Sequence, residues 1–126
     1  MQEDYRIINH LQICFCSWSD TPNIVFLHGW LDQAAGWNQV ALNLSQKGHA
    51  VCAYDQRGHG KSEHAPLSSH YHFPDYVADL DAILQTLPHQ KVTLIGHSMG
   101  GTVASLYSAL RPQKISKLVL IEGLGP

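Results

Sequence analysis

The chain has 126 residues and a mass of 14.0 kDa, which is enough for one domain. Its 44% hydrophobic and 14% charged residues exclude a disordered chain, a collagen-like repeat and a charged coiled coil. The net charge of −2 provides no broad basic surface for nucleic acid or anionic lipid. The sequence has no apolar run near the roughly 20 residues of a membrane span and no secretory signal, so we predict a cytoplasmic protein that binds neither nucleic acid nor a membrane.

The first predicted elements are two strands, residues 4–9 and 11–18, which a tight turn at Asn9 and His10 joins into an antiparallel hairpin. Four short apolar runs follow, and each is rich in Val, Ile and Leu without polar alternation. Such runs are typical of parallel strands that helices cover on both faces. The runs are residues 24–27, 51–54, 92–95 and 118–121.

Stretches with apolar residues at helical spacing lie between these runs, at residues 37–44, 73–87 and 103–110. Glycine or proline follows each stretch as a stop signal. Residues 62–72, which are rich in serine and histidine, are predicted to form a surface loop. The alternation of strands and helices predicts an α/β fold, with a mostly parallel sheet, helices on both faces and an antiparallel N-terminal hairpin.

The three cysteines, Cys14, Cys16 and Cys52, lie in apolar segments with strand-like patterns. An odd number of cysteines in such positions favours buried, reduced thiols in the core. Metal and redox sites usually separate their cysteines by two or more residues, whereas a single residue separates Cys14 from Cys16. We therefore expect no metal site at these thiols.

Residues Gly96-His97-Ser98-Met99-Gly100 fit the pattern G-x-S-x-G. They directly follow the third apolar run and open a helical stretch, which is the strand–turn–helix setting of a nucleophile elbow. Such a turn lifts the serine hydroxyl above the sheet and needs small neighbours. The helix N-terminus directs its positive dipole end at any charge that develops near the serine. The alternative is a glycine-rich helix start without a catalytic role.

Two other loops follow apolar runs and therefore lie at the same carboxyl edge of the predicted sheet. His28-Gly29-Trp30 follows the first run, where a backbone N–H could hold an oxyanion. Residues 55–62 follow the second run, and Asp55 and Arg57 are expected to tie this loop down.

Three rival sites are disfavoured by the residues present. A P-loop, G-x-x-x-x-G-K-[ST], ending at Ser62 would need glycine where Asp55 stands, and the dinucleotide pattern G-x-G-x-x-G is absent. His64, His70 and His72 lie in a polar loop without neighbouring acidic residues, so we expect no metal site there either.

The segments L-H-G-W, D-Q-R-G-H-G-K-S and G-H-S-M-G-G together resemble the α/β-hydrolase superfamily, in its serine esterase and C–C hydrolase branch. The resemblance runs from about residue 24 to residue 121. It implies an incomplete α/β-hydrolase fold, with residues 1–126 as the N-terminal part of one domain that lacks the lid and the C-terminal strands. The implied activity is that of a carboxylesterase-like serine hydrolase, which cleaves a small ester, thioester or related carbonyl compound through an acyl-serine intermediate, without a cofactor.

The same resemblance implies roles for individual residues. Ser98 would be the nucleophile, and the backbone N–H groups of Trp30 and Met99 would form the oxyanion hole. Gly96 and Gly100 would be the glycines of the elbow. A serine at position 98 also separates the chain from dehalogenases and epoxide hydrolases, which use aspartate there.

The chain departs from the family pattern after the nucleophile. In the family an acid and then a histidine base follow it, but none of the nine histidines comes after Ser98. Glu122 is the one candidate for the acid, while His28 and His97 are expected to have no role in proton transfer. The alternative function is therefore a non-catalytic, hydrolase-like fragment or ligand-binding protein.

The last apolar run, residues 118–121, is predicted to be an interior strand whose outer neighbour is missing. Its bare edge would attract a second polypeptide or a second copy of the chain.

Overall fold

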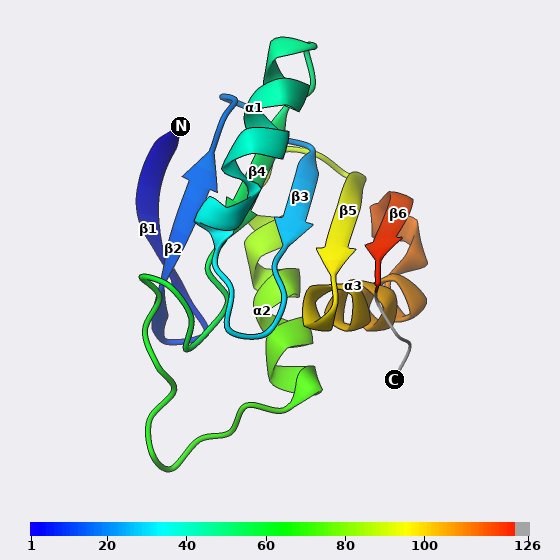
Figure 1. Cartoon of the computed structure of the whole chain (residues 1–126). Coiled ribbons are helices and arrows are strands. Elements are labelled where there is room, and N and C mark those ends of the chain that lie inside the picture. The colour runs from blue at the N-terminus through cyan, green and yellow to red at the C-terminus, as the bar shows by residue number, and fades with distance from the viewer. Residues whose placement is uncertain (123–126) are drawn as a thin grey trace.

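The computed structural model describes residues 1–122. A six-stranded sheet has the order β1-β2-β4-β3-β5-β6, and helices lie on both of its faces (Figure 1). The strands are β1 (Gln2–Ile8), β2 (Leu11–Ser17), β3 (Ile24–Leu27), β4 (Val51–Tyr54), β5 (Val92–His97) and β6 (Ile115–Ile121). The helices are η1 (Ala34–Trp37), α1 (Asn38–Gln46), α2 (Phe73–Gln85), α3 (Met99–Leu110) and η2 (Pro112–Lys114).

The pairing of the strands confirms the predicted α/β class. Strand β3 pairs in parallel with both β4 and β5, and β5 pairs in parallel with β6. Strands β1 and β2 form an antiparallel hairpin, which joins the sheet through an antiparallel pairing of β2 with β4. The sheet is therefore mostly parallel, with an antiparallel N-terminal edge.

The hairpin turn explains where β1 ends and β2 begins. Asn9 and His10 have φ angles of 48° and 70°, and Ile8 pairs with Leu11 across the turn. Two consecutive positive φ angles in a two-residue loop are typical of a type I′ turn, in which asparagine is common at the first position. Asn9 therefore belongs to the turn and not to the strand, so β1 ends one residue earlier than predicted.

Two apolar layers fill the space between the sheet and its helices. Helices α2 and α3 pack on one face, and η1 and α1 pack on the other. Strands β3 and β4 have the predicted bounds, and all of their residues except the half-buried Ile24 are buried, which confirms that their continuous apolar runs mark strands covered on both faces. Along β2, Ile13 and Phe15 face α2 and α3, whereas Cys14 and Cys16 face the α1 side.

The helices begin close to their predicted positions. Helix α2 begins after His72, which forms a capping box with Asp75, and Pro74 lies in its first turn. The weaker stripe at residues 37–44 lies mainly in α1, and η1 leads into it. Residues 63–72 contain neither helix nor strand, as predicted for the loop. None of the helices within residues 1–122 is long and apolar enough to cross a bilayer.

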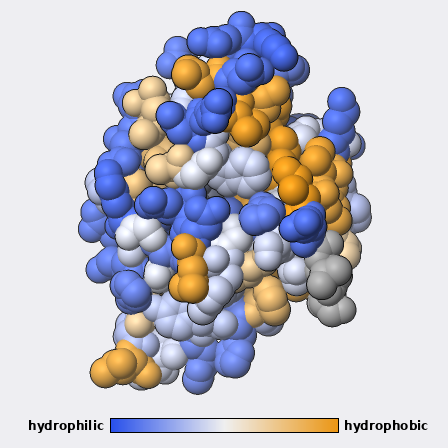
Figure 2. All heavy atoms as spheres, viewed as in Figure 1, coloured by the Kyte–Doolittle hydropathy of each residue, from blue (hydrophilic) through white to orange (hydrophobic). Residues whose placement is uncertain are grey.

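The last strand is longer than predicted, and its outer edge is bare as predicted. It begins at Ile115 instead of residue 118, and within residues 1–122 it pairs only with β5. Its apolar residues Leu118, Val119, Leu120 and Ile121 are 38–44% exposed. Figure 2 shows hydrophobic side chains on the molecular surface over the region where Figure 1 places β6. In the described structure β6 is therefore an exposed edge strand, as expected for an interior strand whose outer neighbour is missing.

Candidate active site

The chain leaves the neighbouring strands β3 and β5 in opposite directions. After β3 it passes through α1 on one face of the sheet to β4, and after β5 it passes through α3 on the other face to β6. Ligands of open α/β sheets bind outside the carboxyl ends of two strands related in this way. Ser98 follows β5, and residues 28–30 follow β3, so both predicted segments lie at this point.

Ser98 occupies a strained turn between β5 and α3. Its φ of 51° and ψ of −116° lie outside the regions that residues other than glycine readily adopt. Its N–H donates a hydrogen bond of 3.0 Å to the carbonyl of Ile121, and its own carbonyl accepts one of 3.1 Å from the Thr102 N–H. Strain of this kind persists only where neighbours hold it, and it is concentrated at functional sites.

The two glycines of the motif allow the close approach of the strands to α3. A Cβ atom on Gly96 would lie 2.5 Å from the carbonyl oxygen of Gly100. A Cβ atom on Gly100 would collide with the carbonyl oxygens of Leu27 and His28, at the end of β3. Any larger side chain at either position would push the helix away from the sheet.

The loop after β3 lies directly against Ser98. A Cβ atom on Gly29 would be 3.4 Å from the Cβ atom of Ser98 and 3.1 Å from Nδ1 of His97. Trp30 follows with its side chain 61% exposed, and its ring meets the ring of His59 edge-on at 5.3 Å between centroids. The structure thus brings together the two segments that the sequence analysis assigned to one site.

His28 is fully buried, and both of its ring nitrogens are engaged. Nε2 accepts the backbone N–H of Gln56 at 3.0 Å, so the proton lies on Nδ1, which donates to the carbonyl of Gly29 at 2.8 Å. Burial lowers the pKa of His28, which keeps the ring neutral. The Gln56 amide adds a hydrogen bond of 2.7 Å to the carbonyl of His28. His28 therefore has no free nitrogen to accept a proton from Ser98.

The loop after β4 is held by buried carboxylates. The carboxylate of Asp55 accepts the backbone N–H groups of Ala34 at 2.7 Å and Lys61 at 2.8 Å. The guanidinium of Arg57 makes two bonds to the carboxylate of Asp79 in α2, at 2.6 and 2.8 Å. These contacts confirm that Asp55 and Arg57 fasten the loop. Hydrogen bonding to Asp79 raises the pKa of Arg57 further above its usual value.

Several residues that support this site were missed in the sequence analysis. Asn9 donates to the carboxylate of Asp79 at 2.9 Å from the hairpin turn, and Gln56 links the loops after β3 and β4. The pairing of Asn9 with Asp79 spans 70 residues, so no local pattern indicates it. Gln56 does stand in the D-Q-R-G segment, where a polar residue directly after a buried strand is a usable signal.

The other candidate residues lie around this centre. Glu122 follows the residue whose carbonyl binds the Ser98 N–H, and it is exposed with a φ of 50°. The rings of His70 and His72 are 5.1 Å apart in the loop before α2. Among residues 1–122, no group of three metal-binding side chains includes His64, His70 or His72.

Comparison with known proteins decides the family. Residues 22–126 match the model of the family described as alpha/beta hydrolase fold. The chain belongs to the α/β-hydrolase family. The resemblance inferred from the three motifs is therefore correct.

Individual proteins match most of the chain. A serine hydrolase-like protein from Danio rerio is 39% identical over 102 residues, which are 81% of this chain and 31% of that relative. A non-heme chloroperoxidase from Burkholderia pyrrocinia is 34% identical over 94% of this chain and 44% of its own length. The solved thioesterase domain from the curacin biosynthetic pathway superimposes with a TM-score of 0.91 and 39% identity, over 97% of this chain and 46% of that domain. The chain thus spans less than half the length of each of these proteins.

Proposed function

We propose that this part of an α/β-hydrolase carries the nucleophile and the oxyanion hole of a carboxylesterase-like serine hydrolase. Its substrate would be an ester, a thioester or a related carbonyl compound. The strained backbone of Ser98, at the point where the chain leaves β3 and β5 in opposite directions, is the observation that carries the proposal. The names of the Danio rerio relative, a serine hydrolase-like protein, and of the curacin thioesterase domain agree with it.

In the proposed reaction, the Ser98 hydroxyl oxygen attacks the carbonyl carbon while a base takes its proton. The carbonyl oxygen becomes an oxyanion, which accepts hydrogen bonds from the backbone N–H groups of Trp30 and Met99. The leaving alcohol or thiol departs with the proton and leaves an acyl-serine, which water then hydrolyses. Met99 is the first residue of α3, and its N–H has no acceptor within the helix because the first N–H groups of any helix lack one.

The base, and in most of the family the acid, would come from a part of the domain beyond residues 1–126. No histidine follows Ser98 in the chain, and Glu122 is the candidate for the acid within it. We also propose that a strand from that missing part, or from a second polypeptide or copy, pairs with the exposed edge of β6. Without such completion the chain would be the non-catalytic alternative, which keeps the serine turn but lacks a working triad.

A fluorophosphonate probe tests the role of Ser98, because it reacts with activated serines. In a protein that contains the whole domain, we expect the probe to label Ser98, and Ser98→Ala should remove both labelling and ester hydrolysis. Ser105→Ala, on the same helix, is the matched control and should retain both. In the 126-residue chain alone, labelling should be weak or absent because the base is missing. Labelling that survives Ser98→Ala would refute the assignment.

A further inference from the structure

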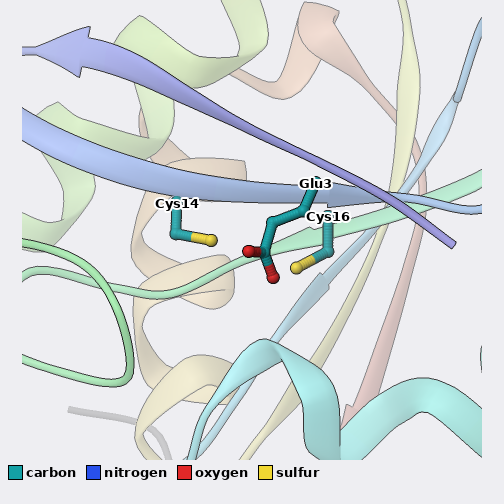
Figure 3. A group of neighbouring side chains, drawn as sticks. All are labelled: Glu3, Cys14 and Cys16. Carbon is teal, nitrogen blue, oxygen red and sulfur yellow. The ribbon is translucent and has the colours of Figure 1, made fainter.

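A second group of reactive side chains lies on the N-terminal hairpin. The thiols of Cys14 and Cys16 and the carboxylate of Glu3 place one ligand atom each within 4.8 Å of the others. Figure 3 shows that both sulfur atoms and the carboxylate converge on one space between the side chains. No other group of three such ligands occurs within residues 1–122, and the proposed chemistry at Ser98 does not use this one.

The geometry of the hairpin produces this convergence. Cys14 and Cys16 are two positions apart on β2, so their side chains project from the same face of the sheet. Glu3 is the direct partner of Cys16 across the β1–β2 pairing and projects from that face as well. The sequence argument against a metal site was that metal-binding cysteines are usually separated by two or more residues. That spacing applies to cysteines in turns. On a strand, a single intervening residue is the spacing that puts two thiols side by side.

We propose that Glu3, Cys14 and Cys16 bind one thiophilic divalent ion of the zinc class and thereby tie β1 to β2. Two thiolates and a carboxylate are a donor set that Zn²⁺ and Cd²⁺ accept in tetrahedral geometry, with water as the fourth ligand. Zn–S bonds of about 2.3 Å place tetrahedral ligands about 3.8 Å apart. Small side-chain movements from the present separation would reach that distance.

Burial restricts access to the two thiols to the side on which Glu3 lies. Cys14 is 0% and Cys16 is 2% exposed, whereas the Glu3 side chain is 29% exposed and forms the accessible side of the group. A buried pair of thiols is shielded from reagents dissolved in the solvent. An ion entering from the Glu3 side would meet both sulfur atoms together.

The ion must displace two protons. Burial, and after it the repulsion that an ionised Cys16, Asp55 or Glu3 would exert, raises the pKa of the Cys14 thiol to about 12, and burial also raises the pKa of Cys16. Both thiols are therefore neutral without an ion. Tyr5 and Lys61 are the other titratable groups that interact with these thiols. Because binding releases two protons, the affinity for the ion should rise about 100-fold for each unit by which the pH is increased, as long as the pH stays below the pKa values of the thiols.

Lys61 competes with the ion for Glu3. Its ammonium lies 2.9 and 3.0 Å from the two carboxylate oxygens, and its side chain is 61% exposed. Removing this charge leaves Glu3 free to bind the ion and removes a cation from the approach. The Lys61→Met variant should therefore bind the ion more tightly than the wild type. Unspecific binding of the ion to thiols would not become tighter in this variant.

The test is a titration of the reduced protein, as a chain that contains the whole domain, with Cd²⁺, followed by the sulfur-to-cadmium absorption in the ultraviolet, and with Zn²⁺ against a competing chelator. We expect one ion per chain. Cys14→Ser and Cys16→Ser should each abolish the absorption band, and Glu3→Gln should weaken binding at least about 10-fold, because even outer-sphere partners of metal sites contribute that much. Cys52→Ser is the matched control, since Cys52 is equally buried but packs on the opposite face of the sheet.

Saturation at any other stoichiometry would overturn the proposal. So would a band that survives Cys14→Ser or one that Cys52→Ser also removes. If the cysteine variants do not fold, the exposed substitutions decide the matter. Unchanged affinity in both Glu3→Gln and Lys61→Met would mean that no such site exists. A thermal midpoint that rises with Zn²⁺ more in the wild type than in Glu3→Gln at the same concentration provides an independent reading, because a ligand that binds only the folded state stabilises it.

Discussion

The backbone of Ser98 is held in its strained conformation by contacts on three sides. The loop after β3 packs against its Cβ atom, the carbonyl of Ile121 accepts its N–H, and Thr102 binds its carbonyl. Strain of this kind costs about 1–3 kcal/mol and relaxes unless such contacts oppose it. Each contact comes from a different element, so the position of one residue depends on the assembly of the sheet edge around it.

A substitution at Met99 can test the oxyanion hole by removing a single backbone N–H group. As the first residue of α3, it occupies the helical position at which proline is tolerated. Met99→Pro removes the N–H and leaves the helix intact, so in a protein with the whole domain kcat should fall about 10²–10³-fold, the usual loss for one donor. Met99→Leu keeps the N–H and should remain near wild type. A folded Met99→Pro variant with normal kcat would place the donor elsewhere.

Among the elements, the loop after β4 is fastened to two others by one buried carboxylate. Asp79 in α2 receives Arg57 from the loop and Asn9 from the hairpin turn. The side chains of Arg57 and Asp79 are only 6% and 3% exposed, so the pair lies in a region of low dielectric. A buried charge that loses its partner there is expensive.

Asp79→Ala should therefore lower the free energy of unfolding by about 3–5 kcal/mol, because it strands the Arg57 charge. Chemical denaturation in urea measures this loss as a lower midpoint. Asp4→Ala is the control, since Asp4 forms an exposed ion pair with Arg6 and should change the midpoint little. Equal midpoints for Asp79→Ala and Asp4→Ala would show that the buried pair does not stabilise the loop.

At the scale of the whole molecule, β1 and β6 form the two edges of the sheet within residues 1–122, and the edge at β6 is the apolar one. Strand β6 presents four consecutive apolar residues that are 38–44% exposed, without a proline or a bulge at Leu118–Ile121 to discourage pairing. An edge of this kind pairs with other chains.

The 126-residue chain on its own should therefore be oligomeric, insoluble or loosely packed. Val119→Lys places a charge in the middle of the edge and should shift the chain toward a monomer in size-exclusion chromatography. Leu67→Lys makes the same change of charge on the exposed loop before α2 and should not. A monomeric wild type with a sharp cooperative thermal transition would contradict this expectation.

The sequence was sufficient where the pattern is local. The apolar runs of β3 and β4, the Asn9–His10 turn and the serine turn after β5 each follow from a few neighbouring residues. Contacts between segments that are distant in the chain could not be predicted from the sequence. Asp79 meets Arg57 and Asn9 only because the fold brings distant segments together. The catalytic roles of Ser98, Trp30 and Met99 stay predictions, because position does not measure reactivity.

The hydrogen bond from the Ser98 N–H to the carbonyl of Ile121 links the strained turn to the end of an edge strand. Edge segments with few covering contacts open locally far more often than the core does. Whenever β6 frays, the turn loses one of its three restraints and can relax toward ordinary backbone. Amide hydrogen exchange at Ser98 would then follow the fraying of β6. A partner that covers this edge would slow that exchange and increase the fraction of time for which the serine is presented.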